Sequence, residues 1–319
     1  MSNSVLRLKT PTFSHHSIAF SPFFENRIAL ASGANFGLVG NGRLHIVQIG
    51  PGGLQVVKRI ACTMLLGMNR MSEYRSESLE IDGRNQVIAA CGNGSLRLFD
   101  ITLEGLPIKA WREHSAEIMS VDWNNIQKDT FATASWDQTV KIWNVDRSQS
   151  LFTVPAHPAQ IYSAVWSPSV PTVIATCAAD GFLKVFDIRD NKAMYAVQAS
   201  PTDVLGCDWN KYDSRQLATA GKDMSVRLWD LRGTTLQPFG ELKGHSLAVR
   251  KLQWSPHHRD VLASSSYDMS CRTWSTQQAM PLYVHSEHTE FVMGLAWSLF
   301  DEGLLASCAW DEEIHLYRS

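Results

Sequence analysis

Short stretches of alternating apolar and polar residues, separated by turns built on Asp or Asn, recur along the 319-residue chain. The stretch at 182–187 (FLKVFD) is typical, and it follows directly on a turn at Asp180. Period-two alternation bounded by Gly, Asp and Asn predicts β-strands joined by tight turns. Around this turn the pattern predicts three further strands, over Ile161–Trp166, Val173–Ala178 and Met194–Val197.

The turns recur at a regular spacing. They fall at Asn41, Asn93, Asp137, Asp180, Asp223, Asp268 and Asp311, and the last five steps are 44, 43, 43, 45 and 43 residues. A second series runs in phase with the first, at Trp123, Trp166, Trp209, Trp254 and Trp297. Two markers with one period of about 40–45 residues predict a WD-repeat β-propeller. The length fits seven blades, so we expect an all-β, seven-bladed propeller that forms a single domain over residues 1–319.

The ends of the chain predict how the ring closes. The last predicted strand reaches Tyr317, two residues before the final Ser319, so no fourth strand follows it in the seventh blade. The segment Ser4–Lys9 alternates and precedes the first inner strand, predicted at Ser17–Phe20. We therefore expect an N-terminal strand, around Val5 to Lys9, to complete the last blade and remove a sheet edge.

A repeated set of polar residues accompanies each turn. A His lies nine residues before four of the Trp markers, at His114, His157, His245 and His288. A Ser or Thr lies four residues before the turn Asp, and an aromatic residue lies six after it. Buried Asp and His need partners, so the set predicts a hydrogen-bond relay inside each blade. Because it recurs from blade to blade, a structural role is favoured over a catalytic triad. Blade five has Ser200 where the others have His.

Composition narrows the function classes. The formal net charge is −2, which argues against a nucleic-acid binder, whose affinity rests on clustered Lys and Arg. No stretch approaches the about 20 apolar residues that span a bilayer, and Met1–Leu8 has no apolar signal region. We expect no nucleic acid partner and no direct membrane insertion. The six cysteines contain no CxxC pair and are interpreted as reduced, structural thiols.

Other candidate chemistry is weak. The pairs His15-His16 and His257-His258 lack further ligands, so we interpret them as solvent-exposed residues and not as metal sites. There is no Gly-rich phosphate loop and no GxSxG elbow. We therefore predict no catalytic residues, no cofactor and no metal. Blade two is degenerate, and its polar insertion, Tyr74–Arg84, is interpreted as a surface loop.

Several strings outside the generic repeat pattern go further. They are Phe20-Ser21-Pro22-Phe23, Asn35-Phe36-Gly37, Gly40-Asn41-Gly42, Ser120-Val121-Asp122-Trp123, Ser135-Trp136-Asp137-Gln138-Thr139-Val140-Lys141, Cys207-Asp208-Trp209-Asn210-Lys211-Tyr212, Ala248-Val249-Arg250-Lys251, Ser265-Ser266-Tyr267-Asp268, His288-Thr289-Glu290-Phe291 and Trp310-Asp311-Glu312. Blade by blade, the chain resembles the peroxisomal import receptors for type 2 targeting signals (PTS2), the WD-repeat peroxins. It departs from them in blade two, where Met64–Met71 lacks the Trp marker.

The resemblance implies a soluble receptor and not an enzyme. Such receptors bind an N-terminal nonapeptide on peroxisomal matrix proteins such as 3-ketoacyl-CoA thiolase. The nonapeptide reads Arg or Lys, an aliphatic residue, five variable residues, His or Gln, then Leu or Ala. It binds as an amphipathic helix that a co-receptor helps to hold. The resemblance further implies contact with peroxisomal docking proteins and shuttling between cytoplasm and peroxisome.

The repeat pattern also predicts where cargo would bind. In a propeller, the loops that lead into the inner strands and the residues before the turn Asp surround one mouth of the channel. These positions supply two carboxylates for a basic cargo residue and an apolar floor for a helix. We predict that cargo contacts Glu117, Asp203, Trp136, Tyr162, Tyr267, Phe291, Met293 and Trp310. The alternative is that these aromatic residues only pack between neighbouring blades.

Two other function classes stay open on the sequence alone. One is a different WD-repeat adaptor, such as a ubiquitin-ligase substrate receptor or a chromatin scaffold, which would prefer other peptides and usually carries an added motif. The other is a propeller enzyme, which would need one chemically distinct cluster of residues. Fold by itself does not decide between them.

Overall fold

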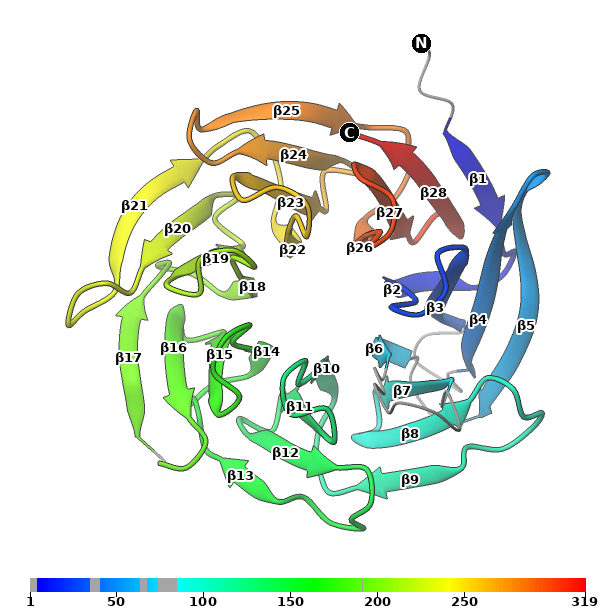
Figure 1. The fold of residues 1–319 in the computed structure, drawn as a ribbon, viewed down its shortest axis with the longest axis horizontal. Helices are drawn as coiled ribbons and strands as arrows, with labels where there is room; N and C mark the ends of the chain where they lie inside the picture. Colours follow the sequence, from blue (N-terminus) through cyan, green and yellow to red (C-terminus); the bar gives the residue numbers. More distant parts are fainter. Residues whose placement is uncertain (1–4, 35–40, 64–67, 74–84, 191) are drawn as a thin grey trace.

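The computed structural model describes residues 5–34, 41–63, 68–73, 85–190 and 192–319, and the side chains of all of these except 62–63 and 68–73. These residues form seven four-stranded antiparallel sheets arranged as a ring (Figure 1). In each sheet one strand lies beside the central channel and the fourth lies at the rim. The predicted seven-bladed, all-β propeller is therefore confirmed.

The strands follow the chain from blade to blade. Blades one to three contain β2 (Ser14–Phe20), β3 (Arg27–Ala34), β4 (Asn41–Gly50), β5 (Gly53–Thr63); β6 (Met68–Glu73), β7 (Gln86–Cys91), β8 (Ser95–Asp100), β9 (Lys109–Arg112); and β10 (Ile118–Trp123), β11 (Thr130–Ser135), β12 (Val140–Asn144), β13 (Phe152–Val154). Blades four and five contain β14 (Ile161–Trp166), β15 (Val173–Ala178), β16 (Phe182–Asp187), β17 (Ala193–Gln198); and β18 (Val204–Trp209), β19 (Gln216–Gly221), β20 (Val226–Asp230), β21 (Gln237–Leu242). Blades six and seven contain β22 (Val249–Trp254), β23 (Val261–Ser266), β24 (Cys271–Ser275), β25 (Met280–His285); and β26 (Val292–Trp297), β27 (Leu304–Ala309), β28 (Glu313–Arg318).

Strand β1 (Leu6–Lys9) supplies the fourth strand of blade seven. It pairs antiparallel with β28, with Leu6 opposite Leu316 and Lys9 opposite Glu313. Figure 1 shows this blue strand beside the red C-terminal strand. The first and last segments of the chain thus complete one sheet, as the sequence predicts.

The apolar core lies between neighbouring blades. Ala132, Val140 and Ile142 of blade three, for example, form one buried cluster with Ile161 and Trp166 of blade four. Inner strands pack on both faces, which is why β14, β18 and β26 are largely apolar without strict alternation. The outer strands are covered on one face only and keep the alternation that makes them visible in the sequence.

The predicted relay is present. In blade three, the Nδ1 atom of His114 lies 2.7 Å from Asp137 Oδ2, its Nε2 atom lies 2.7 Å from Thr133 Oγ1, and Trp143 Nε1 donates to the same hydroxyl. Blades four, six and seven repeat the His–Asp and His–hydroxyl contacts through His157, His245 and His288. In blade five the Ser200 hydroxyl donates to Asp223 instead.

The prediction of a solvent-exposed His15-His16 pair is wrong, because His16 is half-buried and His15 is buried. For His15 the difference is large. Its side chain is completely buried, and its ring nitrogens lie 2.7 Å from Thr10 Oγ1 and 3.1 Å from the Glu313 carbonyl oxygen. His15 thus connects blade one to β28 of blade seven and to Thr10, the residue that follows β1. His257 is half-buried, with Nε2 2.9 Å from the Ser298 carbonyl oxygen, whereas His258 is exposed as expected.

Five of the six cysteines have described side chains, and all five are buried free thiols: Cys91, Cys177, Cys207, Cys271 and Cys308. Burial raises the pKa of the Cys271 thiol to about 12, so it stays protonated. The interpretation as reduced, structural thiols is confirmed for these five.

Some predictions fall outside the described residues. They concern Asn35-Phe36-Gly37, Gly40, the start of Met64–Met71, the insertion Tyr74–Arg84 and the side chain of Cys62. The described ranges contain no helix with the length and apolar character that a membrane crossing requires.

Candidate functional site

In each of blades three to seven, one backbone hydrogen bond joins the two segments that the sequence places at the cargo-binding mouth. The residue before each turn Asp donates its N–H to the carbonyl of the residue three positions after the His site. The five bonds are Trp136 to Glu117 (3.0 Å), Ala179 to Gln160 (2.9 Å), Lys222 to Asp203 (3.0 Å), Tyr267 to Ala248 (3.0 Å) and Trp310 to Phe291 (3.1 Å). The loops and turns paired by the sequence argument are therefore neighbours in blades three to seven. We call the end of the channel that these residues surround the turn-side mouth.

Blades six and seven place an aromatic cluster at this mouth. The rings of Tyr267 and Phe291 are stacked with centroids 4.9 Å apart, and Phe291 lies 5.4 Å from Trp310. His16 of blade one contacts Trp310 edge-on at 6.3 Å. Trp310 is 38% exposed, so the cluster presents an apolar surface to solvent. These aromatic residues pack between blades, as the alternative interpretation expected, and they also remain accessible.

Blades three to five form a second, more polar part. Trp136 contacts Tyr162 edge-on at 6.3 Å, and the Tyr162 hydroxyl donates to Asp203 Oδ2 at 3.0 Å. Lys222 Nζ lies 2.8 Å from the same oxygen. Burial and the bond to Asp203 raise the pKa of Tyr162 well above its usual value. Partial burial opposes ionisation of Asp203, but Lys222 and Tyr162 outweigh it and lower the pKa of that carboxyl.

The two predicted carboxylates therefore differ. The charge of Asp203 is balanced by Lys222, the residue that precedes the turn residue Asp223. Glu117 is half-buried, and within the described part of the chain its carboxylate has neither an ion pair nor a hydrogen bond. Glu117 is thus the acid that remains available to a basic ligand. Tyr162 and Met293 are only 9% and 8% exposed and offer little contact surface.

A cavity of about 460 Å³ occupies the channel at the other ends of the same inner strands. Its wall includes Asp122 and Asp208, which accept the backbone N–H groups of Trp166 and Trp254 in the next blades at 2.7 and 2.8 Å. Burial raises the pKa of Asp122 to about 6. These acids tie neighbouring blades together, a role that the sequence argument missed because the acceptor and donor lie more than forty residues apart.

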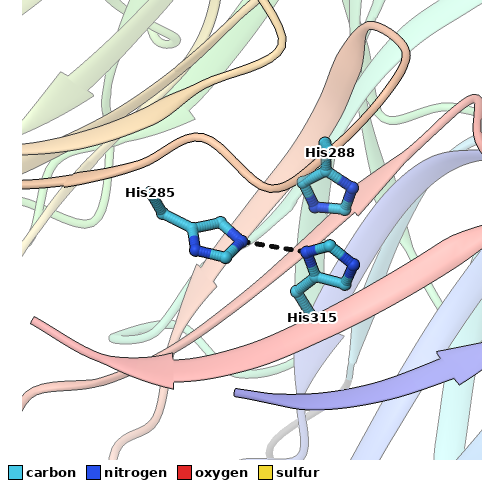
Figure 2. Close-up of side chains that lie close together, drawn as sticks. All are labelled: His285, His288 and His315. Atoms are coloured by element: carbon cyan, nitrogen blue, oxygen red, sulfur yellow. Dashed lines mark hydrogen bonds between the residues drawn. The ribbon is translucent and has the colours of Figure 1, made fainter. Parts of the chain in front are cut away.

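A cluster of buried histidines lies in blades six and seven (Figure 2). His285 Nε2 lies 2.9 Å from His315 Nδ1, and the His288 and His315 rings are stacked at 3.8 Å and nearly parallel. His315 Nε2 faces the Glu313 carboxylate at 3.0 Å and donates to it. His315 Nδ1 is therefore an acceptor, and His285 donates the bond between the two rings.

This histidine geometry suits hydrogen bonding better than metal coordination. A metal requires ring lone pairs that converge at about 2.0–2.1 Å. The rings of His288 and His315 are stacked, so their nitrogen lone pairs lie in parallel planes and do not converge on one point. In addition, His288 Nδ1 already contacts Asp311, and its Nε2 contacts Ser307. The three rings therefore belong to the hydrogen bonding and packing within blade seven and between blades six and seven. Sequence reasoning found only His288, because the repeat does not mark His285 or His315.

The WD40 family (WD domain, G-beta repeat) matches residues 105–144, 148–187, 192–230, 236–275 and 279–318. Over 316 residues, 99% of this chain and 100% of the relative, the chain is 34% identical to the peroxisomal targeting signal 2 receptor of Schizosaccharomyces pombe. The chain belongs to the peroxisomal targeting signal 2 receptor family.

Other members of this family are also similar along most of their length. The chain is 51% identical to peroxisome biogenesis protein 7 of Arabidopsis thaliana, which covers 96% of this chain and 95% of the relative. It is 44% identical to the human peroxisomal targeting signal 2 receptor, with 90% and 87% covered. Membership in the receptor family confirms the resemblance drawn from the motif strings.

Proposed function

We propose that this protein is a soluble receptor that binds the PTS2 nonapeptide of peroxisomal matrix proteins, such as 3-ketoacyl-CoA thiolase, at the turn-side mouth. One observation carries the proposal: the mouth combines an accessible aromatic cluster around Trp310 with the unpaired carboxylate of Glu117. The names of the relatives support the same assignment. The proposed role is binding, with the propeller acting as one domain and without catalysis.

The mouth matches the chemistry of such a signal. An amphipathic helix would place its aliphatic and Leu positions on Tyr267, Phe291 and Trp310, where aromatic rings offer a large, rigid contact area. Its Arg or Lys would then point towards Glu117, on the blade-three side of the mouth. A hydrogen bond to a charged group is worth about 1.5–3 kcal/mol, which is roughly ten- to a hundredfold in affinity.

The open mouth also gives a co-receptor a role. A helix that lies on this floor keeps its opposite face in water, so a second protein can cover that face and increase the buried area. Delivery would then follow by contact with docking proteins at the peroxisome, with the receptor moving between cytoplasm and peroxisome.

Charge reversal tests this function. Glu117→Lys should weaken binding of a fluorescent thiolase N-terminal peptide at least tenfold, measured by anisotropy with co-receptor present. Glu302→Lys is the control, because Glu302 is exposed, pairs with His258 and lies in the connection between β26 and β27, at the opposite ends of these strands from the mouth. Circular dichroism checks the fold of both variants. Asp203→Lys is a less clean probe, because it also removes the partners of Lys222 and Tyr162. Unchanged affinity of Glu117→Lys would place the site elsewhere.

A further inference from the structure

Blade six differs from blades three to five in the pairing of one basic side chain. Four residues after the turn Asp, blades three to five carry a basic side chain whose charged group is bound by an acceptor. These bonds join Lys141 to Thr153, Lys184 to the Ala156 carbonyl, and Arg227 to Asp223 and the Ala199 carbonyl. Blade six has Arg272 at this position, and its guanidinium lies over the Trp274 ring, 5.8 Å from the centroid. Within the described ranges this guanidinium has no hydrogen-bond acceptor and no carboxylate partner. Its Nε atom is buried and unpaired.

The outer strand beside Arg272 is apolar where its counterparts are polar. Val284 of β25 lies directly opposite Arg272, so both side chains share one face of the sheet. The exposed side chains of the strand form an apolar row of Met280, Leu282 and Val284, which are 48%, 53% and 42% exposed. A register shift between Tyr283 and Pro281 places Leu282 at a bulge in this row. The intervening Tyr283 packs against the buried cluster of blade seven instead.

The equivalent rows in other blades are broken by polar or small residues. In β21 the row is Gln237, Phe239 and Glu241, and in β17 it is Met194, Ala196 and Gln198. Arg97 of blade two also lacks an acceptor in the described chain, but it lies opposite Ala110 and not beside an apolar row. Among the described residues of blades two to six, a cation without a hydrogen-bond acceptor beside an exposed apolar row is therefore found in blade six.

We propose that Arg272, Met280, Leu282 and Val284, the blade-six patch, bind an amphipathic helix of a partner protein that carries an Asp or Glu beside its apolar stripe. The acid supplies the acceptor that Arg272 lacks, in a charge-assisted hydrogen bond. Leu282 and Val284 are two positions apart on the strand, a spacing of at most about 6.8 Å, which is close to the about 6 Å between residues i and i+4 of a helix.

A helix fits this edge better than an added strand. Pro281 lies within β25 and removes one backbone N–H from the edge strand of blade six. Proline on an edge strand hinders pairing with a further strand but leaves the side-chain row available. Strand β25, which carries the apolar row, lies at the rim of the ring, whereas the inner strands that lead from the turn-side mouth lie at its centre (Figure 1). The two surfaces can therefore be occupied together.

The test uses two synthetic helical peptides with Leu at positions i, i+4 and i+8. One carries Glu beside the Leu stripe and the other carries Lys at the same position. Fluorescence anisotropy should show at least tenfold tighter binding of the Glu peptide to the full-length protein. Leu282→Gln and Arg272→Gln should each weaken binding of the Glu peptide at least tenfold. Met194→Gln is the matched control, because Met194 is the equivalent residue of blade four and is 54% exposed.

The outcomes separate this site from the cargo mouth. Glu117→Lys should leave binding of the Glu peptide unchanged, so failure of the cargo proposal does not decide this one. Equal binding of the two peptides, or parent-like binding by Leu282→Gln with thermal unfolding unchanged, would overturn the proposal. So would sedimentation showing that the parent dimerises and Leu282→Gln does not, since the patch would then bind a second copy of this chain.

Discussion

At the scale of single residues, the turn aspartates hold the blades together. Asp268 accepts hydrogen bonds from His245 Nδ1 at 2.8 Å, from the Ser246 N–H at 3.0 Å and from the Ser270 hydroxyl at 2.6 Å. Burial opposes its ionisation, yet these donors keep the pKa of Asp268 well below its usual value. The carboxylate is therefore a structural acceptor, and the resemblance of the relay to a catalytic triad is one of residue types only.

Asp268→Ala should lower the free energy of unfolding by roughly 1–3 kcal/mol, because it leaves the buried His245 and three further donors without their acceptor. Urea unfolding followed by tryptophan fluorescence measures the loss. A variant with parental stability that fails only in cargo binding would show that Asp268 has a functional and not a structural role.

The buried histidines predict the direction of the pH dependence. Burial and the neighbouring His315 and His288 lower the pKa of His285 to about 3, from an ordinary value of 6.5. Between these two values the unfolded chain binds the proton and the folded chain does not, so stability is present above pH 6.5 and is lost as the pH falls towards 3.

His285→Gln should therefore flatten this loss. On going from neutral pH to pH 5, the free energy of unfolding should fall by about 1–2 kcal/mol more in the parent than in the variant. Buried His15, whose pKa is also lowered to about 3, keeps part of the acid sensitivity in both proteins. Urea titrations at the two pH values measure the difference, and parallel losses in parent and variant would contradict the assignment of His285 as a buried neutral base.

At the scale of elements, the closing strand β1 is the clearest case of sequence determining topology. Leu6 and Leu8 pack against the cluster formed by blades one and seven. Burying such side chains contributes about 1.5–3 kcal/mol each when burial is complete, and β1 also covers the edge of β28.

Deleting residues 1–10 should thus lower the melting temperature by several degrees or more, measured by differential scanning calorimetry. Deleting only residues 1–4, which precede β1, is the control. Equal melting curves for the parent and the longer deletion would mean that β1 adds nothing to ring stability.

The strands of blade four show what a sequence can predict. The bounds of β14, β15 and β16 agree with the alternating pattern, because each strand ends at a turn residue that the sequence marks. Strand β17 extends one residue further at each end, since its outer residues pair with β16 without burying an apolar side chain.

Side-chain partners from different blades could not be predicted in the same way. The mouth positions follow from the repeat, but the pairing of Asp203 with Lys222 and Tyr162 depends on how two blades meet. The burial of His15 likewise depends on the contact between blade one and Glu313 of blade seven.

At the scale of the whole molecule, the ring converts a sequence period into a surface. Residues about 43 positions apart become neighbours around one channel, so Glu117, Phe291 and Trp310 come to one mouth although the chain separates them widely. The same architecture leaves the blade-six patch at the rim. A receptor of this shape can therefore hold cargo at its centre and a partner at its edge.

The central claim is that Glu117 binds the basic residue of the cargo helix. The most direct test exchanges the charges of Glu117 and of the cargo residue, because a gain of binding is harder to produce by misfolding than a loss. The thiolase N-terminal peptide is made with its first basic signal residue changed to Glu, and its affinity is measured with the parent and with Glu117→Lys. The account predicts that this peptide binds Glu117→Lys at least tenfold more tightly than it binds the parent. If the altered peptide binds both proteins with the same affinity, Glu117 does not contact that residue and the proposed orientation of the cargo is contradicted.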